Sequence, residues 1–202
     1  MLQPVEPELI ASRGIGIEDL TVIRNLETAL EEEMKNTAAY KAYALRAEEE
    51  ELPGLASLFR ATAKAEQIHA SNHARVLRHM GGSTMPDVPR PRVDSTFENL
   101  KAALVDQRFE VDYLYPAFLT SAVSLLDSTA MRSFHWALEA DKSHAQLYSD
   151  IVMRLNSNGG AGWALHPHDF YVCGLCGFTA ENSDKENCPA CNYVREKFER
   201  IR

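Results

Sequence analysis

Two pairs of side chains in this sequence have the types and the spacing of metal ligands. Glu66 and His69 are three residues apart, and so are Asp141 and His144. On a helix, that spacing places both side chains on one face, one turn apart. Each pair also interrupts a stripe of apolar residues, so we expect both pairs to be buried. An isolated buried charge is very costly, and each carboxylate must therefore pair, become protonated or bind a cation.

Two further carboxylates are expected at the same level of the core. Glu33 lies on the inner stripe of the first predicted helix, and Glu110 lies one turn beyond Gln107 on the third. Carboxylates with imidazoles suit iron or manganese, and zinc is also possible. Ferritin-like dinuclear bundles use this donor set, a Glu from each of two helices and Glu-x-x-His from the other two. The sequence thus predicts a two-metal site made by Glu33, Glu66, His69, Glu110, Asp141 and His144.

A second metal site is predicted near the carboxyl end. The four cysteines of the chain form two C-x-x-C pairs, Cys173 with Cys176 and Cys188 with Cys191. In a reducing compartment, paired C-x-x-C units are metal ligands more often than disulfides. Gly177 follows the first pair, and Asn192 the second, where a left-handed backbone is wanted. An S4 cage of iron would carry single electrons, but zinc uses the same knuckles.

The elements that must position these residues are mostly helices. The apolar pattern predicts four of them, over residues of about 19–51, 55–80, 95–126 and 127–155. The third helix should bend at Pro116, which lacks the amide hydrogen that a helix needs. Residues 83–94 hold three prolines and predict an extended linker along the bundle. Five aromatic residues of the tail are expected to form its small core: Phe170, Tyr171, Phe178, Tyr193 and Phe198.

The helices repeat one design. The second carries the stripe Leu55, Phe59, Thr62, Glu66, His69, His73, Val76 and Met80, and a shift of 75 residues gives Ala130, Phe134, Ala137, Asp141, His144, Tyr148, Ile151 and Leu155. The first and third helices are related by a shift of 74, which aligns Glu33 with Gln107. One Glu-x-x-His pair arises often by chance, but two on repeated stripes do not. His73 has Tyr148 at its repeat position, so we interpret it as a core or supporting residue rather than a ligand.

Composition limits the classes of function. The chain has 202 residues and a formal net charge of −8, so it has no basic surplus for a nucleic-acid partner. No apolar run approaches the length that spans a bilayer, and the N-terminus lacks a signal pattern, so we expect a cytoplasmic protein without membrane contact. We expect a lead-in over residues 1–18, the helical bundle over 19–157 and the cysteine domain over 158–202.

Taken together, the motifs resemble the rubrerythrin family over nearly all of residues 20–202. The resemblance is carried by Glu33-x6-Tyr40, Glu66-x-x-His69, the segment 98–103 (ENLKAA), Tyr115-Pro116-x-Phe118 and the cysteine tail. It implies an all-α, ferritin-like four-helix bundle with a small C-terminal domain of rubredoxin-like or zinc-ribbon β structure. It also implies two iron ions in the bundle, and it favours iron over zinc at the four cysteines.

The function that the resemblance implies is a peroxidase. Hydrogen peroxide would be reduced to water at the two irons, and the cysteine-bound iron would return the electrons, obtained from a redox donor protein, across a head-to-tail homodimer. In the family, one iron moves between a glutamate and a histidine, here Glu110 and His69 by position. Tyr40 and Tyr115 correspond to the family's inner tyrosines, which donate hydrogen bonds to the carboxylates.

The sequence departs from the family at two of its expected ligands. Helix three carries Gln107, and helix four carries Asp141, where the family has Glu. Gln107 is neutral and a poorer ligand, so one iron is replaceable by another divalent metal. Two other functions stay open at this point, a ferroxidase or iron-binding protein that consumes oxygen slowly, and a non-enzymatic protein stabilised by metal.

Overall fold

The structure is a computed structural model that describes residues 17–124, 128–157, 160–182 and 186–202. Residues 1–16 of the predicted lead-in lie outside these ranges. The helices are α2 (Ile17–Glu49), α3 (Pro53–Met80), α4 (Thr96–Phe109), the π-helix η1 (Glu110–Leu114), α5 (Tyr115–Ser124), α6 (Ser128–Leu155) and α7 (Gly160–Ala164). The tail holds β1 (Phe170–Cys173), β2 (Thr179–Ala180), the 3-10 turn η2 (Arg195–Lys197) and β3 (Phe198–Ile201).

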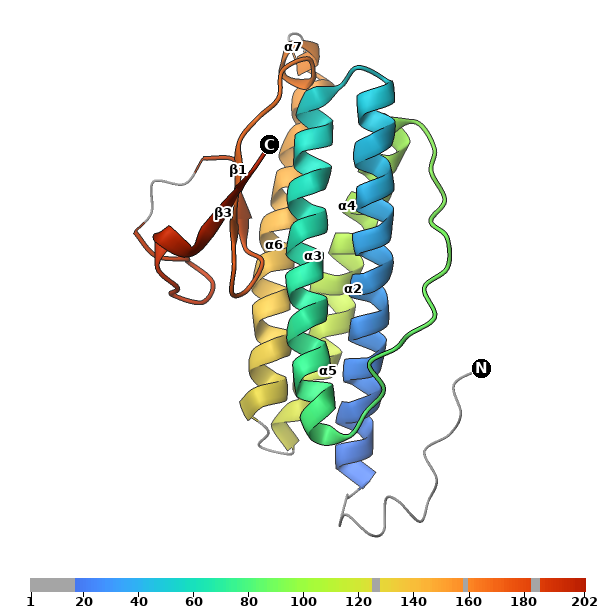
Figure 1. Cartoon of the computed structure of the whole chain (residues 1–202), viewed down its shortest axis with the longest axis vertical. Coiled ribbons are helices and arrows are strands. Elements are labelled where there is room, and N and C mark those ends of the chain that lie inside the picture. The colour runs from blue at the N-terminus through green and yellow to red at the C-terminus, as the bar shows by residue number, and fades with distance from the viewer. Residues whose placement is uncertain (1–16, 125–127, 158–159, 183–185) are drawn as a thin grey trace.

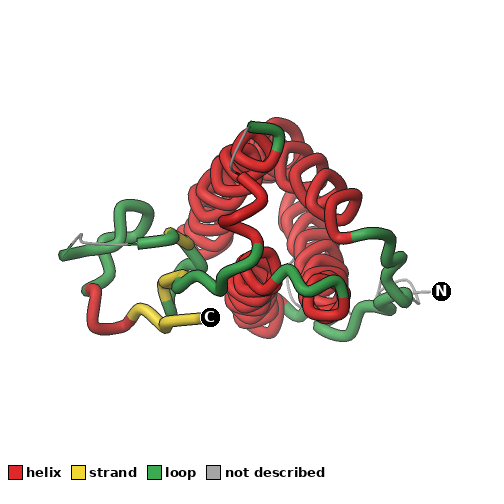
Figure 2. Tube along the Cα trace, turned by 90° about the horizontal axis from the view of Figure 1, so that it is seen from above, coloured by secondary structure: helices red, strands yellow, loops and turns green. Residues whose placement is uncertain are grey.

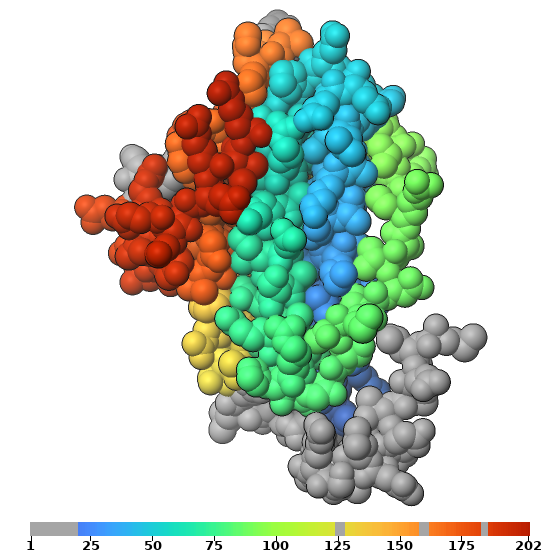
Figure 3. Space-filling view, viewed as in Figure 1, coloured from blue at the N-terminus to red at the C-terminus, as the bar shows by residue number. Residues whose placement is uncertain are grey.

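The long helices form the ferritin-like bundle that the sequence predicts. One hairpin consists of α2 and α3, and the other of α4, η1 and α5 followed by α6 (Figure 1). Residues 82–95 have no regular structure and run along the outside of α2 from one end of the bundle to the other (Figures 1 and 3). Seen from above, this crossover and the tail domain lie on opposite sides of the bundle (Figure 2). Among the described residues, none of the helices combines the length and apolar composition needed to span a bilayer.

Local signals in the sequence explain where the helices begin and end. Helix α3 ends at Gly81, whose φ of 80° is the left-handed conformation that glycine adopts without strain. Ser95 caps α4, because its hydroxyl accepts a hydrogen bond from the amide of Glu98. Pro53 occupies the first turn of α3, where its missing amide hydrogen costs nothing.

The third predicted helix is not one bent α-helix. Its regular hydrogen bonding changes at Glu110, six residues before Pro116, to the π-helical turn Glu110–Leu114, which is closed by the amide of Tyr115 bonding the carbonyl of Glu110. The sequence predicted a bend at Pro116, whereas the irregularity that the structure shows is the π-turn just before it. A π-turn inserts one extra residue, which rotates the following helix by about 100°. As a result Tyr115, rather than Leu114, is fully buried.

Among the described residues, the core of the helical bundle consists of two apolar clusters separated by a polar layer. One cluster contains Leu26, Leu77, Phe118 and Phe134, and the other contains Tyr40, Phe59, Leu100 and Tyr148. On each long helix, the predicted ligands lie between the segments that build the two clusters. The polar layer is therefore enclosed on both sides by packed hydrocarbon, where an uncompensated charge is least tolerated.

The tail is a three-stranded antiparallel sheet of order β2-β1-β3 that packs against α3 and α6 (Figures 1 and 3). The sequence predicted that its five aromatic residues form a core of their own, and this is only partly correct. Phe178, Tyr193 and Phe198 pack around the cysteines together with Trp136 of α6, whereas Phe170 joins the bundle cluster with Tyr40 and Phe59. The tail thus shares apolar cores with the bundle. The boundary expected between residues 157 and 158 falls beside the undescribed residues 158–159.

Candidate metal centres

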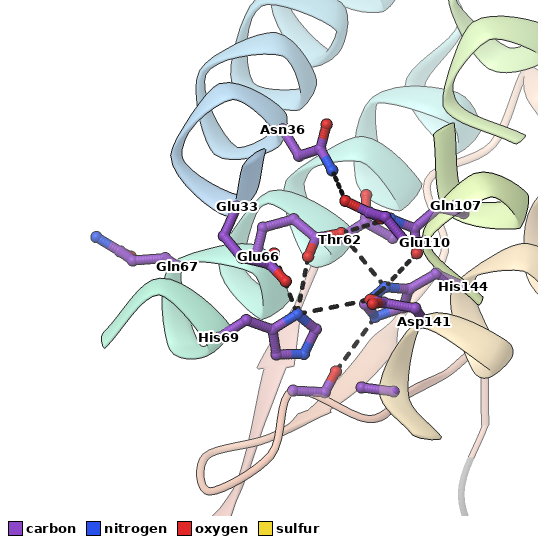
Figure 4. Close-up of polar contacts among 12 residues, drawn as sticks. Glu33, Asn36, Thr62, Glu66, Gln67, His69, Gln107, Glu110, Asp141 and His144 are labelled. Carbon is purple, nitrogen blue, oxygen red and sulfur yellow. Dashed lines mark hydrogen bonds and ion pairs between the residues drawn. The ribbon is translucent and has the colours of Figure 1, made fainter. Parts of the chain in front are cut away.

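Six side chains meet in the polar layer of the bundle. Glu33 comes from α2, Glu66 and His69 from α3, Glu110 from η1, and Asp141 and His144 from α6 (Figure 4). All six are at most 3% exposed to solvent. The predicted level of the core is therefore correct, although burial by itself does not establish which of the six are ligands.

The two imidazoles have the same orientation. Nδ1 of His69 faces the carboxylates of Glu33 and Glu66, at 3.3 and 2.9 Å, and Nδ1 of His144 faces Asp141 at 3.3 Å. Each Nε2 instead faces the tail domain. Histidines that bind metals commonly donate the hydrogen of their second nitrogen to a carbonyl, which leaves the first nitrogen free as a ligand.

The tail supplies those acceptors. Nε2 of His69 donates to the carbonyl oxygen of Cys176 over 2.9 Å. Nε2 of His144 lies 3.3 Å from the carbonyl oxygen of Gly177 and 3.1 Å from Oγ1 of Thr179. When the two rings are neutral, as metal ligands must be, these acceptors in the loop of the first cysteine pair hold the hydrogen on Nε2 of His69 and His144 and leave each Nδ1 free.

The donor atoms form two groups that fit metal ions. Glu33, His69 and Asp141 make one group and Glu66, Asp141 and His144 the other, and within each group the possible ligand atoms lie within 4.8 Å of one another. Asp141 belongs to both groups. Apart from the imidazoles of His69 and His144 that face them, both of its carboxylate oxygens and one oxygen of Glu66 are buried without a hydrogen-bond partner. Orphaned carboxylate oxygens in a dry core are the acceptors that a cation would satisfy.

In the absence of metal, protons shared between the carboxylates and the imidazoles balance the negative charges of the polar layer. Burial, opposed by the charge of His69, raises the pKa of Glu33 well above its usual value, and burial raises that of Glu110. Burial would also raise the pKa of Glu66, but hydrogen bonds from His144 and His69 outweigh it and the pKa is lowered. Against its own burial, hydrogen bonds to Asp141 and Glu66 raise the pKa of His144 to about 9. Protons on the imidazoles thus occupy the electrostatic role that divalent ions would take.

Glu110 is held differently from the other carboxylates. Its Oε1 accepts a hydrogen bond from Nδ2 of Asn36 at 2.7 Å, and its Oε2 accepts one from Nε2 of Gln107 at 2.7 Å. It belongs to neither group of possible ligands found among the described residues. Two amide donors therefore satisfy this carboxylate at the edge of the site.

Gln107 occupies the centre of a hydrogen-bond network. Its Nε2 also lies 3.1 Å from Glu66 Oε1 and 3.3 Å from the hydroxyl of Tyr40, and its Oε1 lies 3.0 Å from Nδ1 of His144. An amide here donates where a carboxylate would accept. For this reason Tyr40 receives a hydrogen bond from Gln107 and, within the part of the chain that the structure describes, donates none to a carboxylate, in contrast to what the resemblance implied.

Tyr115 does donate to a carboxylate, since its hydroxyl makes a short hydrogen bond to Glu33. His73 lies behind it, with Nε2 3.1 Å from the hydroxyl of Tyr115. His73 is fully buried and outside both groups of possible ligands, in keeping with its interpretation as a supporting residue. Sequence reasoning did not find Asn36, although its position three residues after Glu33 places it on the same helical face.

The four cysteines form the second site. Sγ of Cys173 lies 3.6 Å from Sγ of Cys191, and Sγ of Cys176 lies 3.5 Å from Sγ of Cys188. A tetrahedral ion with bonds of about 2.3 Å requires sulfur–sulfur distances of about 3.8 Å, so the thiols fit such an ion closely. The left-handed residues are the predicted ones, Gly177 with φ 80° and Asn192 with φ 60°. Cys191 is the one cysteine of the four that is partly exposed.

Comparison with known proteins gives consistent matches to one family. The family model described as Rubrerythrin matches residues 24–152. Rubrerythrin-2 of Clostridium acetobutylicum is 32% identical over 161 residues, which are 79% of this chain and 85% of that protein. Nigerythrin of Nitratidesulfovibrio vulgaris is 30% identical, over 88% of this chain and 85% of its own. A solved structure of nigerythrin in its fully reduced, all-ferrous state superposes with a TM-score of 0.80 at 29% identity, covering 89% of this chain and 86% of that one.

Proposed function

The chain belongs to the rubrerythrin family, and from this membership and the geometry of its two sites we propose that it is a non-haem di-iron peroxidase that reduces hydrogen peroxide to water. The observation that carries the proposal is the direct hydrogen bonding between the bundle histidines and the cysteine loop. A protein that only stores or binds iron has no need for such a contact between a redox centre and its metal pair.

The bundle would hold the two irons in the two donor groups, with Asp141 common to both. When bound, two ferrous ions supply one electron each to the O–O bond, and two protons complete the formation of two waters. The all-ferrous state recorded for nigerythrin supports iron as the metal. The residues of this chain supply the dry pocket, the fixed imidazole tautomers and the acceptors that keep the ions in place.

We assign the route of peroxide to a cavity of 320 Å³ beside Glu110. It is lined by Asn36 and Asp106 of the bundle and by residues 89–92 of the crossover. Glu110 is 3% exposed, whereas Glu33, Glu66 and Asp141 are fully buried, so this edge of the layer is nearest to solvent. Peroxide is small and polar, which suits a cavity whose lining includes the polar and charged side chains of Lys35, Asn36 and Asp106.

The cysteine site would return electrons to the pair. A donor protein would deliver them near Cys191, the partly exposed cysteine, and they would pass from Cys176 to His69 through one hydrogen bond. The contact is present within a single chain. A head-to-tail homodimer, which the resemblance implies, would make the same contact with the tail of the partner.

The test uses protein loaded with iron under anaerobic conditions. We expect the reduced cysteine site to be colourless, to turn red on addition of peroxide, and to do so much more slowly in a Glu66→Ala variant. Oxidation by oxygen but not by peroxide would instead indicate a ferroxidase. A tail that takes up only zinc from iron-rich medium would contradict the electron relay.

The assembly can be tested by complementation. Cys173→Ser removes the tail site and Glu66→Ala the bundle site, so neither variant should turn over peroxide by itself. Mixed after unfolding and refolding together, they regain activity if the tail of one chain serves the bundle of another. No recovery in a mixture that forms dimers would show that each tail serves its own bundle.

A further inference from the structure

A chain of buried hydrogen bonds runs from the metal layer toward the outside of the bundle. Tyr115 donates to Glu33, Nε2 of His73 lies 3.1 Å from the hydroxyl of Tyr115, and Oγ of Ser133 lies 2.8 Å from Nδ1 of His73. His73 and Tyr115 are fully buried and Ser133 is 4% exposed. The rings of His73 and Tyr115 are stacked with centroids 5.9 Å apart, which keeps the hydrogen bond aligned.

The direction of these hydrogen bonds follows from counting hydrogens. Tyr115 has a single hydroxyl hydrogen, which it gives to Glu33, so its oxygen must accept from His73. Nε2 of His73 therefore carries the ring hydrogen. A neutral ring has only this one hydrogen, so Nδ1 accepts from Oγ of Ser133 at 2.8 Å. Every donor in this series of hydrogen bonds points toward Glu33.

The outer end of the chain reaches a cavity. Ser133 lines a cavity of 260 Å³ between α3, α6 and the cysteine loop, together with Arg75, His79, Arg132 and Leu175. A water molecule occupies about 30 Å³ of liquid, so several waters fit there. The cavity is distinct from the one beside Glu110, which lies between α2, the crossover and α4.

We propose that Ser133, His73 and Tyr115 form a proton path from this cavity to Glu33. The inference rests on the proposed function, because reduction of one peroxide consumes two electrons and two protons in a fully buried site. It gives the protons a route separate from that of the peroxide and from that of the electrons. Histidine is the side chain most used as a proton shuttle.

Each transfer along the path conserves protons. The hydroxyl proton of Tyr115 moves to the carboxylate of Glu33, the Nε2 proton of His73 replaces it, and the hydroxyl proton of Ser133 moves to Nδ1. A proton from cavity water restores Ser133. The imidazole ends as the other neutral tautomer, and reorientation of its ring prepares the path for the next proton.

A matched pair of substitutions tests the path. Ser133→Thr and Ser133→Val add the same bulk to α6, but only threonine keeps the hydroxyl and valine also excludes a replacement water. With the iron-loaded protein, we expect Ser133→Val to slow peroxide turnover by about a hundredfold, the low end of what a positioned proton donor contributes. Its solvent deuterium isotope effect should also rise, because proton delivery becomes limiting. Ser133→Thr should restore most of the rate. Ser57 is a buried serine that, among the described residues, donates to the carbonyl of Pro53, so Ser57→Ala should leave both the rate and the isotope effect unchanged.

A second readout needs no turnover. In protein loaded with Zn²⁺, NMR can follow the exchange of the His73 ring hydrogen with water. Exchange of this hydrogen should be slower in Ser133→Val than in Ser133→Thr. In the separate turnover assay, a His73→Leu variant, which lacks the relay nitrogen, should be as slow as Ser133→Val. Equal exchange rates in the Thr and Val variants would overturn the path. Absence of peroxide turnover in the unsubstituted protein would reject the proposed peroxidase, while the exchange rates would still decide the path.

Discussion

The carbonyl oxygen of Cys176 accepts a hydrogen bond from Nε2 of His69, 107 residues earlier in the chain, at 2.9 Å. This bond joins a residue of the cysteine site to a residue of the bundle site without an intervening side chain. Its geometry depends on Gly177, because a Cβ there would overlap the imidazole of His69 and lie 3.1 Å from the carbonyl oxygen of Ala65. The φ of 80° at this position independently favours glycine.

Gly177→Ala should separate the two sites. The added methyl group must push the cysteine loop away from His69, so electron transfer from the tail to the bundle should slow by at least about tenfold, while both sites keep their metal. Stopped-flow absorption of the tail chromophore after a peroxide pulse measures the transfer. Gly162→Ala is the control, since a Cβ there meets no atom within 4 Å. Equal rates in the two variants would show that the loop contact does not carry electrons.

Gln107→Glu should have opposite effects on the metal-free and metal-loaded protein. Without metal, a carboxylate would face Oε2 of Glu110, which now accepts a hydrogen bond over 2.7 Å, so the melting temperature should fall. With metal, the extra negative charge should tighten binding and lower the reduction potential by tens of millivolts, where about 30 mV of a two-electron couple corresponds to about 1.4 kcal/mol. Thermal melts and a redox titration measure both effects. Gln67→Glu, on the exposed side of α3, is the control and should change neither the melting temperature nor the reduction potential. An unchanged potential in Gln107→Glu would show that residue 107 does not lie close enough to the metals to affect them.

Removal of one predicted ligand should empty the bundle site selectively. Glu66→Ala and His144→Ala each delete a member of the group Glu66, Asp141 and His144. We expect the bundle to retain less than about one ion per chain, because loss of a ligand weakens metal binding and exposes unbalanced carboxylates, while the four cysteines keep their ion. Metal analysis by mass spectrometry gives both occupancies. Full occupancy of the bundle in either variant would contradict the assigned ligands.

Metal uptake by the bundle should release protons. Hydrogen bonds to the carboxylates, opposed by burial, raise the pKa of His144 to about 9, so the metal-free ring is protonated at neutral pH. A histidine must be neutral to bind a metal, so the apparent affinity should rise with pH until about 9 and weaken as the pH falls. Calorimetric titration with Zn²⁺ in buffers of different ionisation enthalpy counts the released protons. An affinity that does not change between pH 6 and 9 would show that His144 is not a ligand.

The main features of both sites could be predicted from the sequence, because they depend on local spacing. Two carboxylate–imidazole pairs three residues apart stay on one helical face whatever the rest of the chain does. The left-handed positions of Gly177 and Asn192 follow from the knuckle itself, since each closes a turn of a few residues. The repeat of the two hairpins likewise placed Glu33, Glu66, Asp141 and their partners at one level of the core.

Only the tertiary structure decided how Tyr115 and the tail take part. Helical periodicity assumes a constant rotation per residue, and the π-turn at Glu110–Leu114 breaks that assumption. The family resemblance pointed to Tyr115 as an inner tyrosine, but the periodicity of the sequence could not give the phase that buries it and brings it to Glu33. The contact of His69 with Cys176 uses a backbone carbonyl, a group that every residue possesses and that no residue pattern reveals. Its position depends on how the sheet packs against α3 and α6, which is set by shared apolar burial between segments far apart in the chain.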